Sequence, residues 1–157
     1  MRIHTRLSVL CFIAAACAGL ATAVTVRAQA PATSARASTV WDGIYTEAQA
    51  KAGSALFAAK CVECHGEDLA GREQAPALAG PAFIEKWNKG SLKKLIEIVE
   101  QMPPDSPKVL TSQQYTDVLA YLLSANEFPA GKAVLPDDRL VLSDIQILVT
   151  APAKPTR

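Results

Sequence analysis

The stretch Cys61-Val62-Glu63-Cys64-His65 decides how this chain folds, because it has the C-x-x-C-H pattern of covalent haem attachment. A helical turn with two cysteines three residues apart presents both thiols to one edge of a porphyrin. The next residue, His65, can then turn its imidazole onto the iron. The chain has only four cysteines and two histidines in 157 residues, so a chance match is rare. The motif therefore predicts one haem c, attached through Cys61 and Cys64.

Residues 1–30 have the pattern of a secretory signal peptide. Arg2 and Arg6 supply its positive start, residues 7–20 its apolar stretch, and Ala28-Gln29-Ala30 a small-x-small cleavage site. The apolar stretch is too short and too rich in alanine to indicate a membrane span. We expect an exported, periplasmic protein with no stable membrane span after cleavage. Retention of the segment as an anchor stays open as an alternative.

Cleavage leaves few chemically active side chains, namely Cys61, Cys64, His65 and Met102. The cysteine pair has two other possible uses: a structural disulfide in an oxidising compartment, and a thioredoxin-like redox pair within a βαβ pattern. The residues before Cys61 favour a helix, and no buried strand precedes them. A zinc site needs four ligands, and no second Cys/His pair remains. Haem attachment is the interpretation that these residues favour.

Length and charge indicate the class of protein. Roughly 127 residues remain after cleavage, which corresponds to one domain. They carry 13 basic and 15 acidic residues, a net charge of −2. This balance gives no support to nucleic-acid binding, which requires a basic surface. We expect an all-α fold packed around haem, with a signal peptide (1–30), a flexible lead-in (31–45), a helical domain (46–128) and an irregular C-terminal extension (129–157).

The spacing of apolar residues predicts four helices. The first opens at a capping box of Thr46 and Gln49 and continues to about residue 60. Gly53 interrupts it at a cost of about 1 kcal/mol relative to alanine, which we explain by close contact with another helix. The other three are predicted around residues 83–87, from a cap at Ser91 to the prolines after Met102, and from Thr111 through residues 118–122. Residues 66–80 and the chain after Phe128 are expected to be irregular, because Gly and Pro recur there.

Met102 is the candidate for the second axial ligand, since it is the one thioether left after cleavage. Met/His ligation is an established pair for haem iron and raises its reduction potential. The prolines at 103 and 104 would restrain the backbone beside it. The alternative is that Met102 fills a gap in the core and that lysine or water is the sixth ligand.

Pro76 and Leu78 are candidates for supporting residues. A ligating imidazole usually gives its other N–H to a carbonyl or carboxylate, which fixes the ring. The Pro76 carbonyl can take this role for His65, with Leu78 packing on the haem. The alternative is that Pro76 only interrupts regular structure in its loop.

The chain resembles the class I c-type cytochromes over about residues 46–126. The resemblance implies a cytochrome c domain whose first and last helices cross near a right angle, with a glycine that lets an aromatic ring of the other helix lie close. Residues 41–46 and 126–131 are similar to exported bacterial cytochromes found beside quinoprotein dehydrogenases. The matching residues are Cys61, Cys64 and His65, Pro76-x-Leu78-x-Gly80, Met102-Pro103, and the helix pair of Gly53 and Phe57 with Tyr121.

The tail from residue 132 to 157 departs from the pattern of this family. Residues 140–149 are mostly apolar. They pack either as an ordinary extension of the domain or against a partner.

An iron atom with both axial positions filled has no open site for oxygen or peroxide. We therefore expect an electron carrier rather than an enzyme, with no catalytic residues. Its partners would be redox proteins, with a quinoprotein dehydrogenase and a terminal oxidase as candidates. Two alternatives stay open: a haem-based sensor or ligand-binding protein in which Met102 is labile, and a fixed electron-transfer subunit of a dehydrogenase complex.

Overall fold

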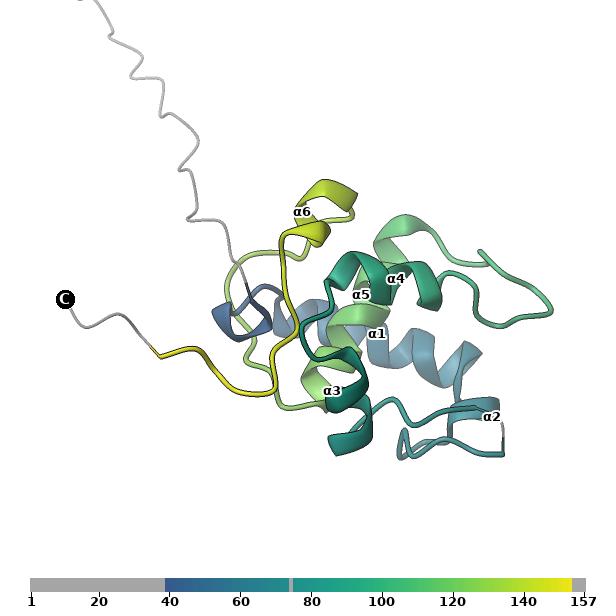
Figure 1. Cartoon of the computed structure of the whole chain (residues 1–157). Coiled ribbons are helices and arrows are strands. Elements are labelled where there is room, and N and C mark those ends of the chain that lie inside the picture. The colour runs from purple at the N-terminus through teal and green to yellow at the C-terminus, as the bar shows by residue number, and fades with distance from the viewer. Residues whose placement is uncertain (1–38, 74, 154–157) are drawn as a thin grey trace, which may run out of the picture. The chain divides into compact units, whose positions relative to one another are not determined.

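The computed structural model describes residues 39–73 and 75–153, so the predicted signal peptide and residues 31–38 lie outside the described part of the chain. Within that part the chain forms helices and three isolated bridges but no strands, which confirms the all-α prediction. None of the described helices combines the length and the apolar character needed to cross a membrane. The elements are a 3₁₀ turn η1 (Val40–Asp42), α1 (Glu47–Lys60), α2 (Val62–His65), α3 (Pro81–Trp87), α4 (Leu92–Val99), α5 (Ser112–Ala125) and α6 (Arg139–Ser143) (Figure 1).

Hydroxyl caps fix where α1, α4 and α5 begin. The Thr46 hydroxyl accepts the Gln49 N–H at 3.2 Å, and the Gln49 side chain accepts the Thr46 N–H at 3.3 Å. Thr111 and Gln114 form the same reciprocal pair at α5. Ser91 accepts the N–H of residue 94 at the start of α4. These bonds satisfy N–H groups that a helix start leaves unpaired, so the helix starts lie where the sequence predicts them.

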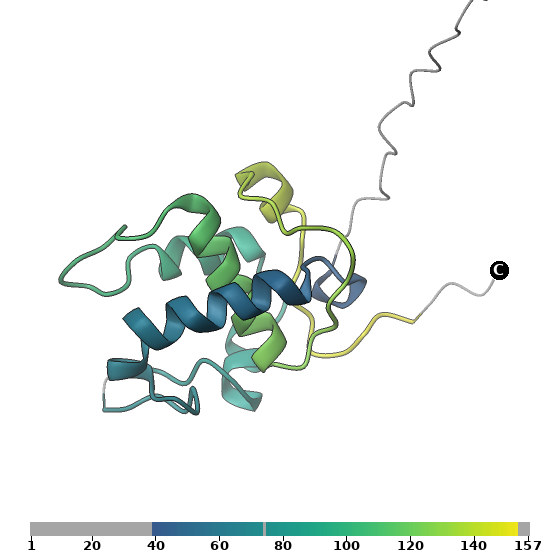
Figure 2. The same ribbon diagram turned by 180° about the vertical axis from the view of Figure 1, so that it is seen from behind.

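α1 lies across α5 where Gly53 faces the backbone of the other helix (Figure 2). A Cβ at Gly53 would lie 1.8 Å from the Asp117 carbonyl oxygen and 2.9 Å from the Val118 nitrogen, closer than real atoms approach. The predicted close contact is present, and the atoms nearest to that Cβ position belong to the backbone of α5. Tyr121 stacks one turn further along, with its ring centroid 5.3 Å from that of Phe57. With no side chain at residue 53, the two backbones themselves can touch.

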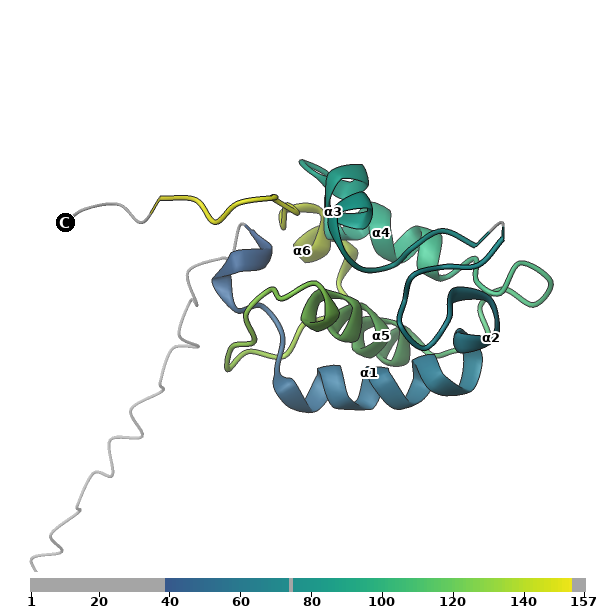
Figure 3. The same ribbon diagram turned by 90° about the horizontal axis from the view of Figure 1, so that it is seen from below.

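α5 lies between α1 and α4, and α6 packs on α4 (Figure 3). Buried apolar side chains from these helices and from both ends of the described chain form the main core. A smaller buried cluster consists of Phe57, Leu69 and Leu122, and Leu78 and Val99 pack against both clusters. The largest fully buried side chains of the main core are those of Tyr45, Phe83, Leu92, Ile96, Leu119, Leu123, Leu135, Leu142 and Ile147.

The described part of the expected flexible lead-in, residues 39–45, is instead packed. Val40 and Tyr45 are buried, with 0% and 1% of their surface exposed. The Tyr45 hydroxyl donates to the Phe128 carbonyl, and the Trp41 indole donates to the Leu148 carbonyl at 2.9 Å. These partners lie far away in the sequence. Composition around residues 31–40 therefore could not reveal the packing.

The C-terminal extension belongs to the same core, so the packing shows no boundary at residue 129. Leu135, Leu142 and Ile147 are fully buried, and the segment packs as an ordinary extension of the domain. α6 was not predicted, because the prolines and glycine at 129–136 indicated irregular structure only. The Asp138 carboxylate accepts the Leu140 N–H at 2.7 Å and caps this helix. An aspartate before an apolar run is the signal that could have found it.

Asn126 fastens the loop of residues 66–80 to the C-terminal end of α5. Its Nδ2 donates to the carbonyls of Leu78 and Leu122 at 2.9 and 2.8 Å. Its Oδ1 accepts the Gly80 N–H at 3.0 Å. The side chain is only 5% exposed, so water replaces these bonds poorly. One buried amide therefore holds the loop in place against α5.

Replacing Gly53 with alanine should destabilise the protein by about 2 kcal/mol or more, because the added methyl group forces α1 and α5 apart. Alanine's better helix propensity, worth about 1 kcal/mol, offsets only part of this. Denaturant unfolding followed by far-ultraviolet circular dichroism measures the change. Lys51→Ala, at an exposed position of α1, is the control and should stay within about 0.5 kcal/mol. Equal stability of Gly53→Ala and wild type would contradict the close crossing.

Replacing Asn126 with alanine should cost about 2 to 3 kcal/mol, since the Gly80 N–H and the Leu78 carbonyl both lose their partner. The same unfolding experiment measures it. Lys132→Ala, at an exposed position shortly after α5, should change stability by less than about 0.5 kcal/mol. A loss for Asn126→Ala no larger than that control would mean that the amide does not hold the loop.

Candidate functional site

A cavity of about 380 Å³ lies between α2, the loop after it and the segment after α4, within the usual range of cofactor pockets. In Figure 1, α2 and the segment after α4 lie on the same side of the described part of the molecule, at the right of the view. All six site residues predicted from the sequence line this cavity: Cys61, Cys64, His65, Pro76, Leu78 and Met102. The remaining walls are mostly apolar and come from Phe57, Ala75, Ala77, Phe83, Trp87, Leu95, Ile98, Val99, Pro103, Pro104, Val118 and Leu122, with Lys60 and Lys86.

One continuous helical path places the cysteines and the histidine. The Cys61 N–H donates to the Phe57 carbonyl at 2.8 Å and so caps α1. Cys61 also begins α2, and its carbonyl accepts the His65 N–H at 3.0 Å. Gly66, with φ of +77°, ends the turn in a conformation that favours glycine. Both thiols and the imidazole therefore come from a single turn beside the cavity.

Within the described residues, Cys61 and Cys64 are not joined in a disulfide. Burial, and second the neighbouring Cys64, raise the pKa of Cys61 above its ordinary value. A raised pKa keeps the thiol protonated at neutral pH. Reactive redox cysteines in Cys-x-x-Cys pairs have a lowered pKa, so the surroundings of Cys61 do not favour the thioredoxin-like interpretation.

The His65 side chain is buried, with 8% of its surface exposed. Its Nδ1 lies 3.0 Å from the Pro76 carbonyl oxygen. A carbonyl oxygen only accepts, so Nδ1 carries the proton in this hydrogen bond. Nε2 of the neutral ring then keeps its lone pair, which is the state that a metal-ligating histidine needs.

The loop of residues 66–80 is shaped by backbone contacts that bring Pro76 to His65. The Leu78 N–H donates to the Leu69 carbonyl at 2.8 Å, and the Gly71 N–H donates to the His65 carbonyl at 3.0 Å. Gly71 has φ of +79°, and a Cβ there would lie 2.4 Å from the Ala75 carbonyl oxygen. The turn therefore depends on glycine at position 71.

Met102 lies just beyond the end of α4. Its N–H donates to the Val99 carbonyl at 3.1 Å, and its side chain is half-buried beside the cavity. Pro103 and Pro104 line the cavity next to it and cannot donate backbone hydrogen bonds. The structure thus brings the one described thioether to the same cavity as the imidazole of His65.

Sequence reasoning assigned none of the other lining residues to the site, and four of them show why. Phe57 precedes Cys61 by one helical turn, so helical periodicity could have placed it on the same face. Lys60 directly precedes the cysteine motif without a pattern of its own. Lys86 and Trp87 lie on α3, with the ammonium 5.9 Å from the indole centroid. Their position depends on how the loop before α3 folds, which local spacing does not reveal.

The residues present fit a covalently attached haem. Two unpaired thiols lie on one turn, the imidazole has one ring nitrogen already bonded, a thioether lines the same space, and the walls are apolar. In residues 39–73 and 75–153, no group of three or more His, Cys, Asp or Glu side chains could hold a metal ion.

Comparison with known proteins agrees with this geometry. A family model described as cytochrome c oxidase, cbb3-type, subunit III matches residues 48–122, a range that includes the cysteine motif and Met102. Cytochrome c-551 of Bacillus subtilis (strain 168) is 34% identical over 82 residues, which cover 52% of this chain and 68% of that protein. No solved structure matches. With these similarities joined to the C-x-x-C-H turn and the all-helical fold, the chain belongs to the class I c-type cytochromes, a family that binds haem c covalently and transfers electrons.

Proposed function

We propose that this chain is an exported monohaem electron carrier in which Cys61 and Cys64 bind the haem and His65 and Met102 are the axial ligands. The observation that carries the proposal is that all four side chains line one apolar cavity. The hydrogen bond from His65 Nδ1 to Pro76 supports the ligand role, because it leaves Nε2 for the metal.

Each residue has a distinct part in this proposal. The two thiols would hold the haem by adding their S–H groups across its two vinyl groups, with no leaving group and no net oxidation. Pro76 orients the His65 ring, and Leu78 would pack on the haem. The haem supplies a one-electron change of iron valence when bound. Phe57 and Leu122 keep water from the cavity, which is one of the means by which a protein sets a haem potential.

If His65 and Met102 both held the iron, no coordination site would be open to a substrate, and electrons would enter and leave by outer-sphere transfer. Lys60, Cys64 and Lys86 are exposed and also line the cavity. We propose that a redox partner approaches here, where the distance to the haem edge would be shortest. Positive charge from the two lysines would favour an acidic surface on that partner.

Location and partners rest on sequence features. The signal-like residues 1–30 lie outside the described residues and support export to the periplasm. We propose a quinoprotein dehydrogenase as electron donor, from the similarity at residues 41–46 and 126–131. A terminal oxidase is proposed as acceptor, since the matching family model is named after an oxidase subunit.

The exported protein should contain one haem per chain that acidified acetone does not extract. A pyridine haemochrome spectrum and mass spectrometry report the thioether bonds, the stoichiometry and the mature N-terminus together. The double variant Cys61→Ala/Cys64→Ala should lose all covalent haem, because no other cysteine remains after cleavage. A colourless wild-type product, or haem that acetone extracts, would refute the proposal.

The variant Met102→Ala should lose the ferric absorption band at the red end of the visible spectrum that reports sulfur–iron bonding. It should also bind carbon monoxide at least about tenfold more readily, because the sixth position opens. Ile98→Ala, another cavity residue and one that is 51% exposed, is the matched control and should keep the wild-type behaviour. A wild type that lacks the band and binds carbon monoxide readily would instead favour the sensor alternative.

A further inference from the structure

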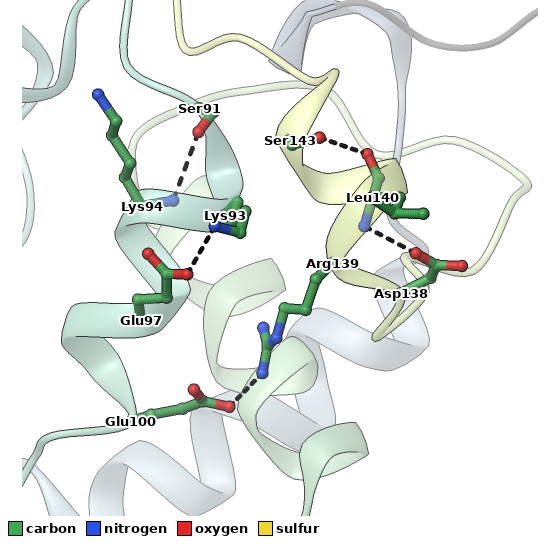
Figure 4. Close-up of polar contacts among 9 residues, drawn as sticks. All are labelled: Ser91, Lys93, Lys94, Glu97, Glu100, Asp138, Arg139, Leu140 and Ser143. Atoms are coloured by element: carbon green, nitrogen blue, oxygen red, sulfur yellow. Dashed lines mark hydrogen bonds and ion pairs between the residues drawn. The ribbon is translucent and has the colours of Figure 1, made fainter.

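We propose that Arg139, through its ion pair with Glu100, is a positioning residue that holds the Met102 segment and keeps the methionine sulfur on the iron. The inference rests on the proposed ligand role of Met102. Figure 4 shows the Arg139 guanidinium, from α6, reaching the Glu100 carboxylate at the end of α4. The C-terminal extension would thereby take part in iron ligation, although it lies outside the region matched by the cytochrome family model.

Glu100 occupies the point from which the Met102 segment departs. Its N–H donates to the Ile96 carbonyl at 2.9 Å and so caps α4. Its carbonyl oxygen accepts the Lys108 N–H at 3.0 Å, which closes residues 101–107 into a loop. Met102 lies two residues into that loop. A displacement of Glu100 therefore moves both ends of the segment that carries the sulfur.

The loop itself is mostly exposed. Apart from Met102 and Pro103, which are half-buried, residues 101–109 are exposed. Segments with few buried contacts open at low free-energy cost, and they depend on the anchors at their ends. The anchor at Glu100 is therefore where a tertiary contact has the most influence on Met102.

The segment that carries the Arg139 guanidinium is firmly packed. Leu142 of α6 is fully buried, and the chain after α6 bonds to the start of α4. The Leu92 N–H donates to the Ile145 carbonyl at 3.0 Å, and the Ile147 N–H donates to the Gly90 carbonyl at 2.8 Å. The C-terminal segment thus holds α4 at its N-terminal end through backbone bonds, and at its C-terminal end through Arg139.

The ion pair is partly shielded from water. The side chains of Arg139 and Glu100 are 32% and 18% exposed, whereas those of the Lys93–Glu97 pair on the same helix are 42% and 47% exposed. Solvent screens a shielded pair less than an exposed one. Arg139 Nη1 is buried without a hydrogen-bond partner among the described residues, and Nη2 makes the ion pair with the Glu100 carboxylate. Removing Glu100 would leave this partly buried cation without that partner.

The test compares Arg139→Gln, Glu100→Gln and the double variant as haem-loaded proteins, with Lys93→Gln as the matched control. In all three pair variants, the ferric sulfur–iron band should disappear at a lower denaturant concentration than the one at which the far-ultraviolet circular dichroism changes. The fraction of chains that bind carbon monoxide should rise about tenfold, with the double variant no worse than either single one. Lys93→Gln should match wild type in both measurements.

Arg139→Lys keeps the charge and provides the same comparison at smaller amplitude should Arg139→Gln fail to accumulate. The inference is overturned if the denaturant midpoints of band loss and of global unfolding fall by the same amount, since a merely structural contact gives that result. It is also overturned if the pair variants behave like Lys93→Gln. Failure of the proposed ligand is distinguished in the wild type alone, which would then show no sulfur–iron band before any substitution is made.

Discussion

Because no Cβ stands between Gly53 and the Asp117 carbonyl, α1 and α5 touch through their backbones, and this contact determines where the next turn of each helix lies. Phe57 on α1 and Leu122 on α5 follow the contact, and both are buried and line the cavity. Cys61 comes one turn after Phe57 and ends α1. The position of the cysteine turn relative to α5 is therefore a consequence of the crossing, so packing at residue 53 and cofactor geometry are coupled.

A set of hydrogen bonds carries this positioning from α5 to the imidazole. Asn126, at the end of α5, binds the backbone of Leu78 and Gly80. The same loop presents the Pro76 carbonyl to His65 Nδ1. These polar contacts involve residues at the edge of an otherwise mostly apolar cavity. α5 therefore supports the site from two directions, through its crossing with α1 and through the loop that orients the histidine.

The features that the sequence predicted correctly depend on residues close together in the chain. The cysteine turn at 61–65 and the caps at Thr46 and Thr111 are each complete within five residues. Gly53 indicated a close helix contact because glycine lowers the stability of a helix unless such a contact requires it. These signals indicated where α1 and α5 begin and where the cysteine turn of the site lies.

The features that escaped prediction have partners that are distant in sequence. The packing of residues 39–45 and the amide of Asn126 depend on segments tens of residues away. The short α6 differs, because its cap at Asp138 is local. Helical spacing and composition describe a segment's own preference and contain no information on which distant carbonyl it will meet.

The ends of the described chain meet each other, and this has a consequence for the order of events. Gln146 bridges to Thr39 and Ser91, and its carbonyl accepts the Val40 N–H at 3.0 Å. Every residue that lines the cavity lies between 57 and 122. In a chain that emerges with its N-terminus first, Cys61 and Cys64 are therefore exposed before Gln146 is available. Contacts of such long sequence separation form late. The topology thus leaves an interval in which haem can reach the two thiols while the chain is still open, before the final segment completes the core.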